Sequence, residues 1–447
     1  MNDRLRIAVF AHEFPALSET FVLNQITGLI DRGHDVTIFA YRPRPESRIH
    51  ADVVQYDLAK VTRYRNVAAN KFAQALAVGA LLVRYVRKLG PVLLRCLDAH
   101  RYGQNVSIRN LFFWAVRTVN EKPFDAIYCH FGPVGQLAVM LRDVGALSGP
   151  VATVFHGVDV SAYVRNKPDV YRFLFSMGDL FLPVSARWRR RLVDLGCPPG
   201  KIEIHHMGVA LETIPFRVRS TDGMEAPLRV LSVGRMVEKK GLAFGLQAVA
   251  QVIRRGIPVQ YTLIGDGPLR HHLEQLANAL GISSSVDFRG WQDRDAVTVA
   301  METSDILLAP SVATADGDEE GIPVTIMEAM AAGTIVVATR HSGIPELVED
   351  GTSGILTSEG SIDELASALT RLVESRDDWA AIRCNARARI NENFDVAKLN
   401  IVLERRLRTM ADAWHPPGPA RGRANTARDE DEAYGDGGHE DRLVRNI

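Results

Sequence analysis

Short apolar runs alternate with amphipathic helical patterns along most of the chain. The N-terminal region sets the pattern, with an apolar run at Arg6–Ala11, a loop, a helical pattern from about Glu19 to Asp31, and a second apolar run at Val36–Ala40. A strand, a helix and a strand in this order predict a βαβ unit with parallel strands. Further strands are predicted in the first half of the chain, at Ala126–Cys129, Val151–Phe155, Leu180–Val184 and Ile202–His205.

The pattern breaks between Leu211 and Pro227, where prolines, a glycine and polar residues predict an interdomain linker. A second series then begins, with predicted strands at Arg229–Val233, Val259–Ile264, Val286–Arg289, Ile306–Ala309 and Ile335–Ala338. Helical patterns separate these strands, at Leu242–Arg255, Leu269–Leu280, Ala296–Thr303 and Pro323–Ala331. Two such series predict an α/β protein with two Rossmann-like, doubly wound domains that face a central cleft.

This organisation divides the chain into five parts. We expect an N-terminal Rossmann-like domain over 1–210, the linker over 211–227, a C-terminal Rossmann-like domain over 228–395, a helix over 396–413 that crosses back to the N-terminal domain, and a disordered tail over 414–447. The tail is predicted from its proline, glycine and acidic residues and from its lack of apolar periodicity.

The charge balance, the cysteines and the apolar runs exclude several classes of protein. Lys and Arg total 53, as do Asp and Glu, so the overall charge indicates no partner, and no nucleic-acid ligand is expected. The four cysteines form no C-x-x-C pair, which argues against a zinc site or a disulfide framework and indicates reduced thiols. The N-terminus lacks the features of a signal peptide, and the longest apolar run, around Ala73–Val83, is shorter than the ~20 residues that span a bilayer. We therefore expect a cytoplasmic protein.

The strongest chemical signal is the segment E-G-I-P-V-T-I-M-E, from Glu320 to Glu328, at a predicted loop-to-helix junction. Pro323 suits the first helical turn, where its missing N–H costs nothing. The free N–H groups of Val324 and Thr325, together with the helix dipole, would form an anion site suited to a pyrophosphate. Glu320 would face the cleft, and Glu328, one turn into the helix, could accept hydrogen bonds from both hydroxyls of a ribose.

Two other interpretations of this segment are open. Both glutamates would be solvated surface residues if no ligand bound there. A metal site is the second alternative, because Asp316, Asp318 and Glu319 cluster with Glu320. The spacing does not complete an EF-hand loop and no histidine lies nearby in the sequence, so no metal is expected.

Two further segments follow predicted strands, where ligands bind in open α/β folds. In G-R-M-V-E-K-K-G, from Gly234 to Gly241, Arg235 and Lys240 could both reach a diphosphate, unless the segment is only an exposed charged turn. In F-H-G-V-D, His156 would face the cleft, unless it is a structural histidine. The segment G-D-G-P at 265–268 lacks the third glycine of a dinucleotide fingerprint and predicts a tight turn near a nucleotide.

Together these motifs resemble the retaining glycosyltransferase family four, whose members have the two-domain GT-B fold. The matching segments are G-R-x-x-E-K-K-G at 234–241, G-D-G-P at 265–268, F-R-G-W at 288–291, E-G-I-P-V-T-I-M-E-A-M-A-A-G at 320–333, S-G-I-P-E at 342–346 and D-G-x-S-G at 350–354. Segments 14–26, 155–161 and 315–323 are similar to the colanic-acid and exopolysaccharide type of bacterial transferase. Many members carry a Gly-Gly loop after the first strand, where this chain has F-P-A-L-S-E-T.

The resemblance implies a nucleotide-diphosphate sugar as donor, a glycan acceptor, no cofactor and no metal. It assigns catalytic roles to His156, Arg235, Lys240 and Glu320. It assigns donor binding to Gly234, Gly265, Asp266, Gly290, Trp291, Ile322, Pro323, Val324, Thr325 and Glu328. Acceptor-side residues would be Ser18, Glu19, Thr20 and Asp159. Retention of the anomeric configuration is implied, and the absence of an obvious nucleophile fits a front-face route assisted by the leaving group.

A basic stretch in the first domain suggests where an acceptor is met. Between Lys60 and Arg117, basic residues interleave with apolar ones, and only Asp98 opposes them. This pattern favours peripheral binding to anionic lipid head groups, as an acceptor linked to polyprenyl diphosphate would require. The alternative is a solvated basic face over ordinary core helices.

Three rival functions share the predicted fold. One is another GT-B enzyme, such as a nucleotide-sugar epimerase or a phosphorylase. The second is a non-catalytic protein that binds a nucleotide sugar, although pure scaffolding would not need all four of Arg235, Lys240, Glu320 and Glu328. The third is a nicotinamide-dependent oxidoreductase, against which the incomplete fingerprint argues.

Overall fold

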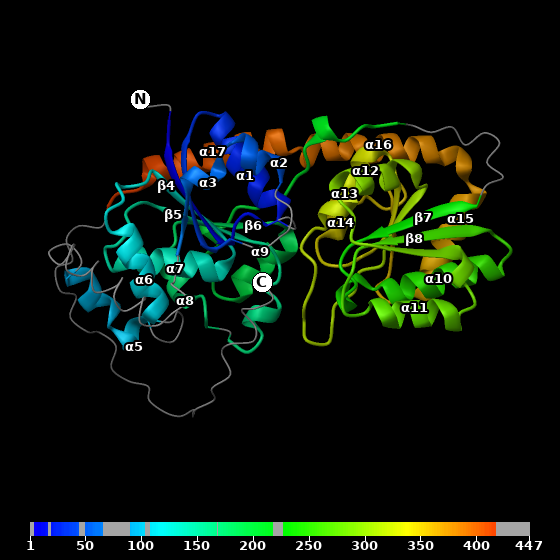
Figure 1. Cartoon of the computed structure of the whole chain (residues 1–447), viewed down its shortest axis with the longest axis horizontal. Coiled ribbons are helices and arrows are strands. Elements are labelled where there is room, and N and C mark those ends of the chain that lie inside the picture. Colours follow the sequence, from blue (N-terminus) through cyan, green and yellow to red (C-terminus); the bar gives the residue numbers. More distant parts are fainter. Residues whose placement is uncertain are drawn as a thin grey trace.

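Two lobes lie side by side, each built around its own sheet (Figure 1). The computed structural model describes residues 4–16, 19–43, 50–65, 90–102, 108–167, 169–217 and 227–416. Among these residues, no helix combines the length and the hydrophobicity that a membrane-spanning segment requires.

The sheet of the first lobe is parallel throughout, with the strand order β3-β2-β1-β4-β5-β6. Its strands are β1 (Arg6–Glu13), β2 (Asp35–Arg42), β3 (Thr62–Tyr64), β4 (Ala126–His130), β5 (Val151–Phe155) and β6 (Leu180–Pro183). Every residue of β4 and β5 is buried, because helices cover both faces of the sheet. This burial explains why the sequence shows continuous apolar runs there rather than alternation.

The sheet of the second lobe repeats this topology, with the order β12-β11-β10-β7-β8-β9 and all pairs parallel. Its strands are β7 (Leu228–Val233), β8 (Val259–Ile264), β9 (Val286–Gly290), β10 (Ile306–Ala309), β11 (Ile335–Thr339) and β12 (Ile355–Thr357). Numbered within each lobe, both orders read 3-2-1-4-5-6, which is the doubly wound Rossmann order. The predicted fold class is therefore confirmed.

Helices cover both sheets. In the first lobe they are α1 (Thr20–Asp31), α2 (Ala51–Gln55), α3 (Leu58–Val61), α5 (Ala99–Tyr102), α6 (Ile108–Thr118), α7 (Gly132–Asp143), α8 (Arg172–Met177) and α9 (Ala186–Asp194). In the second lobe they are α10 (Leu242–Arg254), α11 (Arg270–Ala279), α12 (Arg294–Thr303), α13 (Val324–Ala332), α14 (Ile344–Leu347), α15 (Ile362–Glu374) and α16 (Trp379–Asn393). The last described helix is α17 (Val396–Ala413).

The strand predicted at Ile202–His205 is wrong. This segment forms only an isolated bridge between Ile202 and Phe181. It follows a 3-10 turn, Pro199–Lys201, and its amides donate to Phe181 and Pro183 in β6. Because Pro183 has no N–H to donate in return, a regular ladder cannot extend along this edge.

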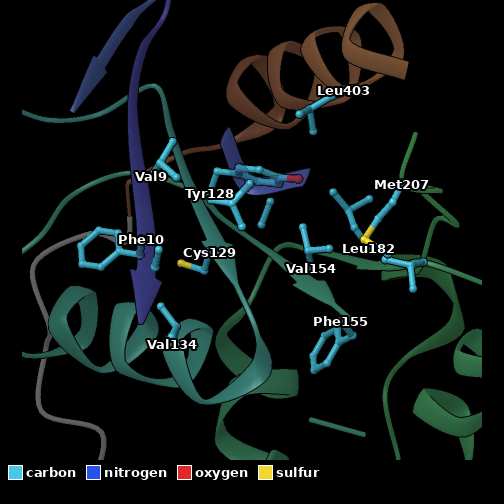
Figure 2. Packing of buried hydrophobic residues seen from close by; sticks show 14 of the residues in the cluster. Val9, Phe10, Tyr128, Cys129, Val134, Val154, Phe155, Leu182, Met207 and Leu403 are labelled. Atoms are coloured by element: carbon cyan, nitrogen blue, oxygen red, sulfur yellow. The ribbon is translucent and has the colours of Figure 1, made fainter. Parts of the chain in front are cut away.

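Helix α17 joins the end of the chain to the first lobe. It follows α16 of the second lobe and packs against α1 and β4, so the chain returns to the lobe in which it began (Figure 1). Figure 2 shows Leu403 of α17 above the strands, with Val134 of α7 on their other side. Leu403 and Leu407 are fully buried, and the α17 residue Asn400 donates to the backbone oxygen of Asn24 at 3.1 Å.

This packing predicts that replacing Leu403 with alanine destabilises the protein by about 2–5 kcal/mol, because a buried leucine loses both its transfer free energy and its packing. Ile401 lies on the same helix but is 51% exposed, and Ile401→Ala should change stability by less than about 0.5 kcal/mol. Denaturant unfolding of the two variants measures the difference. Equal effects would contradict the packing of α17 described here.

Candidate active site

Three loops meet at the carboxyl edge of the second sheet, after β7, β8 and β9. The Gly234 amide donates to the Ile264 oxygen at 2.9 Å, and the Gly265 amide donates to the Gly290 oxygen at 2.8 Å. The backbone oxygen of Asp266 accepts the amide of Met236 at 2.9 Å. These bonds hold the loops in a fixed order along the sheet edge.

The side chains in these loops differ in exposure. Trp291, directly after β9, is 56% exposed, and the exposed Asp266 accepts the Gly267 amide at 2.7 Å. The Arg235 side chain is also exposed. An open indole face and an open guanidinium at one edge are suited to a flat base and a phosphate, respectively.

The turn after β7 places Lys240 inside the site. This 3-10 turn, Glu238–Lys240, ends at Gly241, whose φ of +61° favours glycine. A Cβ on Gly241 would lie 1.8 Å from the Pro310 oxygen, so the backbone of the turn packs directly against the loop after β10. The Lys240 side chain crosses Gly234, and its Nζ lies 3.2 Å from Oε1 of Glu320.

The Glu320 carboxylate is 12% exposed and lies just before α13. Burial raises its pKa, but the ammonium groups of Lys240 and Lys239 lower it more, so the net shift is downward. Glu320 is therefore ionised at neutral pH.

The N-terminus of α13 faces the same place. Lys240, Pro323 and Thr325 line one small cavity, which the buried Ile322 adjoins along the chain. Pro323 is the N-cap rather than a residue of the first turn, as its extended ψ of 120° shows, so the helix begins at Val324. Among the described residues, the amides of Val324 and Thr325 have no hydrogen-bond acceptor. Two free amides beside an ammonium group form a site for an anion.

Glu328 lies one turn further along α13. Burial raises its pKa from 4.5 to about 7, against a smaller lowering by Arg294. At neutral pH this half-buried carboxyl is therefore only partly ionised. Hydroxyl donors at this point would favour its ionised form, since hydrogen bonds to a carboxylate lower the pKa.

The acidic run before Glu320 is paired with basic side chains. Asp318 lies 3.0 Å from Lys239, and Glu319 forms two bonds to Arg187 of the first lobe, at 2.7 and 2.6 Å. Within the ranges that the structure describes, no cluster of three or more His, Cys, Asp or Glu side chains could hold a metal ion. The run thus fixes loop geometry and links the two lobes.

His156 faces this loop from the end of β5. Its Nε2 lies 3.2 Å from Nδ1 of His130, which ends β4. The ring centroids of Phe21 and Phe131 each lie 4.6 Å from the centroid of the His156 ring. Burial lowers the pKa of His156, so the ring is neutral. Its buried Nδ1 has no protein partner among the described residues and could bond to a ligand.

The lobes meet at the backbone beside His156. A Cβ on Gly321 would lie 2.4 Å from the His156 oxygen, so only glycine permits this approach. The contact brings the His156 end of the first sheet against the loop that carries Glu320.

Asp159, which the sequence assigned to the acceptor side, lies in the interior of the first lobe. It is fully buried, and its carboxylate accepts the amides of Gly132, His156 and Gly157 at 2.9–3.0 Å. Burial raises its pKa to about 6, and these amides act in the opposite direction. Asp159 therefore shapes the turn that carries His156, because each of its bonds ends on backbone.

Comparison with known proteins decides the family. The profile described as "Glycosyl transferase 4-like domain" matches residues 18–208, and the one described as "Glycosyl transferases group 1" matches residues 227–375. The chain is 37% identical over 417 residues, 91% of its length and 100% of the other, to a Salmonella typhimurium protein named as the colanic acid biosynthesis glycosyltransferase WcaL. This chain belongs to the glycosyltransferases.

Other relatives of this glycosyltransferase agree. It is 38% identical over 401 residues, 88% of its length and 96% of the other, to the amylovoran biosynthesis glycosyltransferase AmsK of Erwinia amylovora. HepE of Anabaena, solved with UDP and glucose, superimposes with a TM-score of 0.66 at 18% identity, covering 91% of this chain and 100% of that one. This last likeness shows the GT-B fold. The epimerase, oxidoreductase and non-catalytic alternatives are not supported.

The structure brings Lys240 together with Glu320, Pro323 and Thr325 in the second lobe, and it brings His156 of the first lobe against the same loop. Glu19 precedes α1 and Thr20 begins it, next to Phe21, which contacts the His156 ring. Ser18 lies outside the described residues. The roles of these residues in donor and acceptor binding stay predictions.

Sequence reasoning overlooked four residues at this interface. His130 ends a strand just as His156 does, and that position was a usable signal. Glu346 accepts the Ala186 amide at the start of α9, at 2.8 Å, and so links the lobes. Arg187 and His341 gave no local signal, since their partners Glu319 and Glu320 lie far away in the sequence.

The raised pKa of Glu328 gives a pH prediction. Between its unfolded pKa near 4.5 and its folded pKa of about 7, the folded state holds a proton that the unfolded chain releases. The contribution of the Glu328 carboxyl to the free energy of unfolding is thus fully present below pH 4.5 and is lost as the pH rises through 7. Glu328→Gln, which cannot ionise, should raise the unfolding temperature relative to the wild type more at pH 8 than at pH 5. Without ligand, the same difference in unfolding temperature between the variant and the wild type at both pH values would contradict the raised pKa of Glu328.

Proposed function

We propose that this glycosyltransferase moves a sugar from a nucleotide-diphosphate sugar to a lipid-linked glycan in the synthesis of a bacterial exopolysaccharide or other cell-surface polysaccharide. The two relatives above are named for exopolysaccharide synthesis, one for colanic acid and one for amylovoran. The donor part of the proposal depends on one observation, the 3.2 Å approach of Lys240 to Glu320 beside the free amides that begin α13.

The site would act mainly on the leaving group. Negative charge grows on the nucleoside diphosphate as the glycosidic bond breaks, and fixed positive groups lower the barrier by stabilising it. Lys240, Arg235 and the amides of Val324 and Thr325 would supply these groups without a metal or a cofactor. Binding of the diphosphate would give Lys240 a second anionic partner besides Glu320, whose carboxylate would then accept hydroxyls of the transferred sugar.

Glu328 and His156 would hold the two ends of the donor. Glu328 would accept the ribose hydroxyls, and its partial ionisation suits a group that gains its charge on binding. His156 would contact the transferred sugar through the unpartnered Nδ1. Gly290 and Trp291 would hold the base, in line with the exposure of the indole.

Among the routes that retain the anomeric configuration, the state of the carboxylates near His156 favours a front-face reaction over a double displacement. A double displacement needs a free carboxylate at the sugar. Asp159 is fully buried and its oxygens bind three amides, while Glu320 is paired with Lys240. A front-face reaction, in which the departing phosphate accepts the proton of the incoming hydroxyl, uses neither of them as a nucleophile.

A lipid-linked acceptor would be met at an anionic membrane surface through the basic stretch 60–117. In the described part of this stretch, Leu94 is 72% exposed and Leu97 is 65% exposed, on either side of the exposed Arg95. Exposed leucines next to cations suit the interface between lipid head groups and acyl chains. Arg101 contributes less, because it is bound to Asp143 at 2.8 and 3.0 Å.

The donor site predicts a strong effect of Lys240→Ala. The variant should be less stable, because the Glu320 carboxylate loses this partner, but it should stay folded. Its transfer activity should fall by about 10²–10³-fold, as expected when a group that stabilises the transition state is removed. Arg255→Ala, which removes a surface cation at the far end of α10, should keep normal activity. Release of nucleoside diphosphate in the presence of acceptor measures both variants.

A panel of nucleotide sugars, screened by thermal shift, identifies the donor for this assay. A donor at 100 times its dissociation constant adds about 2.7 kcal/mol of stability, and Lys240→Ala should abolish that gain. Near-normal transfer by Lys240→Ala would overturn the proposal. Conversion of the donor into an isomerised sugar without acceptor would favour an epimerase.

The membrane part has its own test. Replacing both Leu94 and Leu97 with aspartate should release the protein from vesicles of phosphatidylcholine and phosphatidylglycerol, measured by co-sedimentation. Val299→Asp is the matched control, since Val299 is 57% exposed on α12 of the other lobe. Charge reversal at three further basic positions, which lie outside the described residues, should act in the same way: Arg84, Arg87 and Lys88. Unchanged co-sedimentation of the leucine variant would contradict membrane binding through this segment.

A further inference from the structure

A buried histidine lies behind the loop that carries Glu320. His341 follows β11, and only 1% of its side chain is exposed. Its Nε2 accepts the backbone amide of Glu320 at 3.1 Å, and its Nδ1 lies 2.8 Å from Oε1 of Glu359. One imidazole therefore joins the Glu320 loop to the segment after β12.

The geometry fixes the tautomer of this ring. A backbone amide can only donate, so Nε2 of His341 must be the unprotonated nitrogen. Nδ1 must then carry the proton and donate it to Glu359. The second Glu359 oxygen, Oε2, accepts the Ala313 amide at 2.9 Å, which holds the carboxylate in place.

The Glu320 peptide is held at both of its polar groups. Its N–H binds His341, and its carbonyl oxygen accepts the hydroxyl of Ser342 at 2.6 Å. The next residue, Gly321, touches the backbone of His156 from the other lobe. The Glu320 side chain therefore leaves a backbone that is fixed on three sides, and it points at Lys240.

We propose that His341, oriented by Glu359, is a positioning residue for sugar transfer. His341 holds the Glu320 peptide so that the Glu320 carboxylate stays beside Lys240. In that position the carboxylate would accept hydroxyls of the sugar being transferred. The inference depends on the role proposed for Glu320, and His341 itself touches neither donor nor acceptor. Its contribution is geometric, because a displacement of about 1 Å at a reacting centre can lower a rate by about 10²-fold.

Three variants remove the bonds of His341 to the Glu320 amide and to Glu359, either together or one at a time. His341→Leu loses both, and we expect kcat to fall by about 10–100-fold. In His341→Gln, the side-chain oxygen can still accept the Glu320 amide, so this variant should recover much of the lost rate. Glu359→Gln keeps one acceptor but places an NH₂ group against a donor, and it should lower kcat to an intermediate degree.

The chain offers a matched control in the first lobe. His34 is also buried, its Nδ1 accepts the Leu5 amide at 3.1 Å, and its Nε2 lies 3.3 Å from Glu404. His34→Leu should therefore destabilise the protein as His341→Leu does, with kcat unchanged. A loss of kcat in both variants would mean that reduced stability, rather than positioning, explains the effect.

Ligand binding separates positioning from general damage to the site. The free nucleoside diphosphate does not contact Glu320 in the proposed arrangement, so the thermal shift that it causes should be the same in His341→Leu and in the wild type. The complete nucleotide sugar should bind the variant more weakly. Equal weakening of both ligands would overturn the inference.

A double-mutant cycle tests whether His341 acts through Glu320. Once Glu320→Ala has removed the carboxylate, adding His341→Leu should lower kcat by less than about 2-fold. A full multiplicative loss would overturn the inference while leaving the proposed function intact. Near-normal activity of Glu320→Ala alone would instead overturn the role proposed for Glu320.

Discussion

The ion pair between Lys240 and Glu320 joins the two loops on which the proposed donor site depends. Lys240 ends the turn after β7 and Glu320 precedes α13, so the pair spans the point at which the strand order reverses, between β7 and β10. Parallel strands bring these loops to one edge of the sheet. The close contact of Gly241 with Pro310 and the hydrogen bond from the Val312 amide to the Lys239 oxygen, at 2.9 Å, hold them together. A buried carboxylate without the ammonium would be costly, so the pair also fixes which way the loop faces.

The second constraint is the closeness of the two lobes. Glu319 and Glu346 of the second lobe bind the first turn of α9, one through Arg187 and the other through backbone amides at a helix N-terminus. The Gly321 backbone, which touches His156, adds a third contact between the lobes. A donor held by the second lobe would thus be covered by the first, and water that could hydrolyse it would be displaced. The same contacts that order the Glu320 loop would therefore also cover the proposed donor site.

The sequence predicted the elements whose signal is local. The strand at Ile306–Ala309 has the predicted bounds, because a buried central strand is apolar at every position. The edge strands β3 and β12 were not predicted, since three residues are too few to show a period. The segment Ile202–His205 has a strand-like composition, but its failure to join the sheet depends on Pro183 in the neighbouring strand.

The site could be predicted only in part, because some of its contacts join residues that are far apart in the sequence. The E-G-I-P-V-T-I-M-E segment predicted a loop-to-helix junction because its proline and its small residues act locally. His341 could not be assigned, since its two partners lie 18 and 21 residues away and only the fold brings them together. Arg187 and Glu319 are separated by 132 residues. Asp159 was assigned to the acceptor side because its motif shows a carboxylate near the cleft but does not show that three amides bind it.

Glu320 and Glu328 show how one short segment gives two carboxylates different states. They lie on the same loop and helix, yet nearby lysines lower the pKa of Glu320 while burial raises that of Glu328 to about 7. Glu320 therefore carries its charge before any ligand arrives and orders the loop through Lys240. The opposing effect of Arg294 on Glu328 is smaller than that of burial, so hydrogen-bond donors from a ligand would stabilise the charge of Glu328 on binding. Charge pairing therefore sets the state of one carboxylate, and burial sets the state of the other.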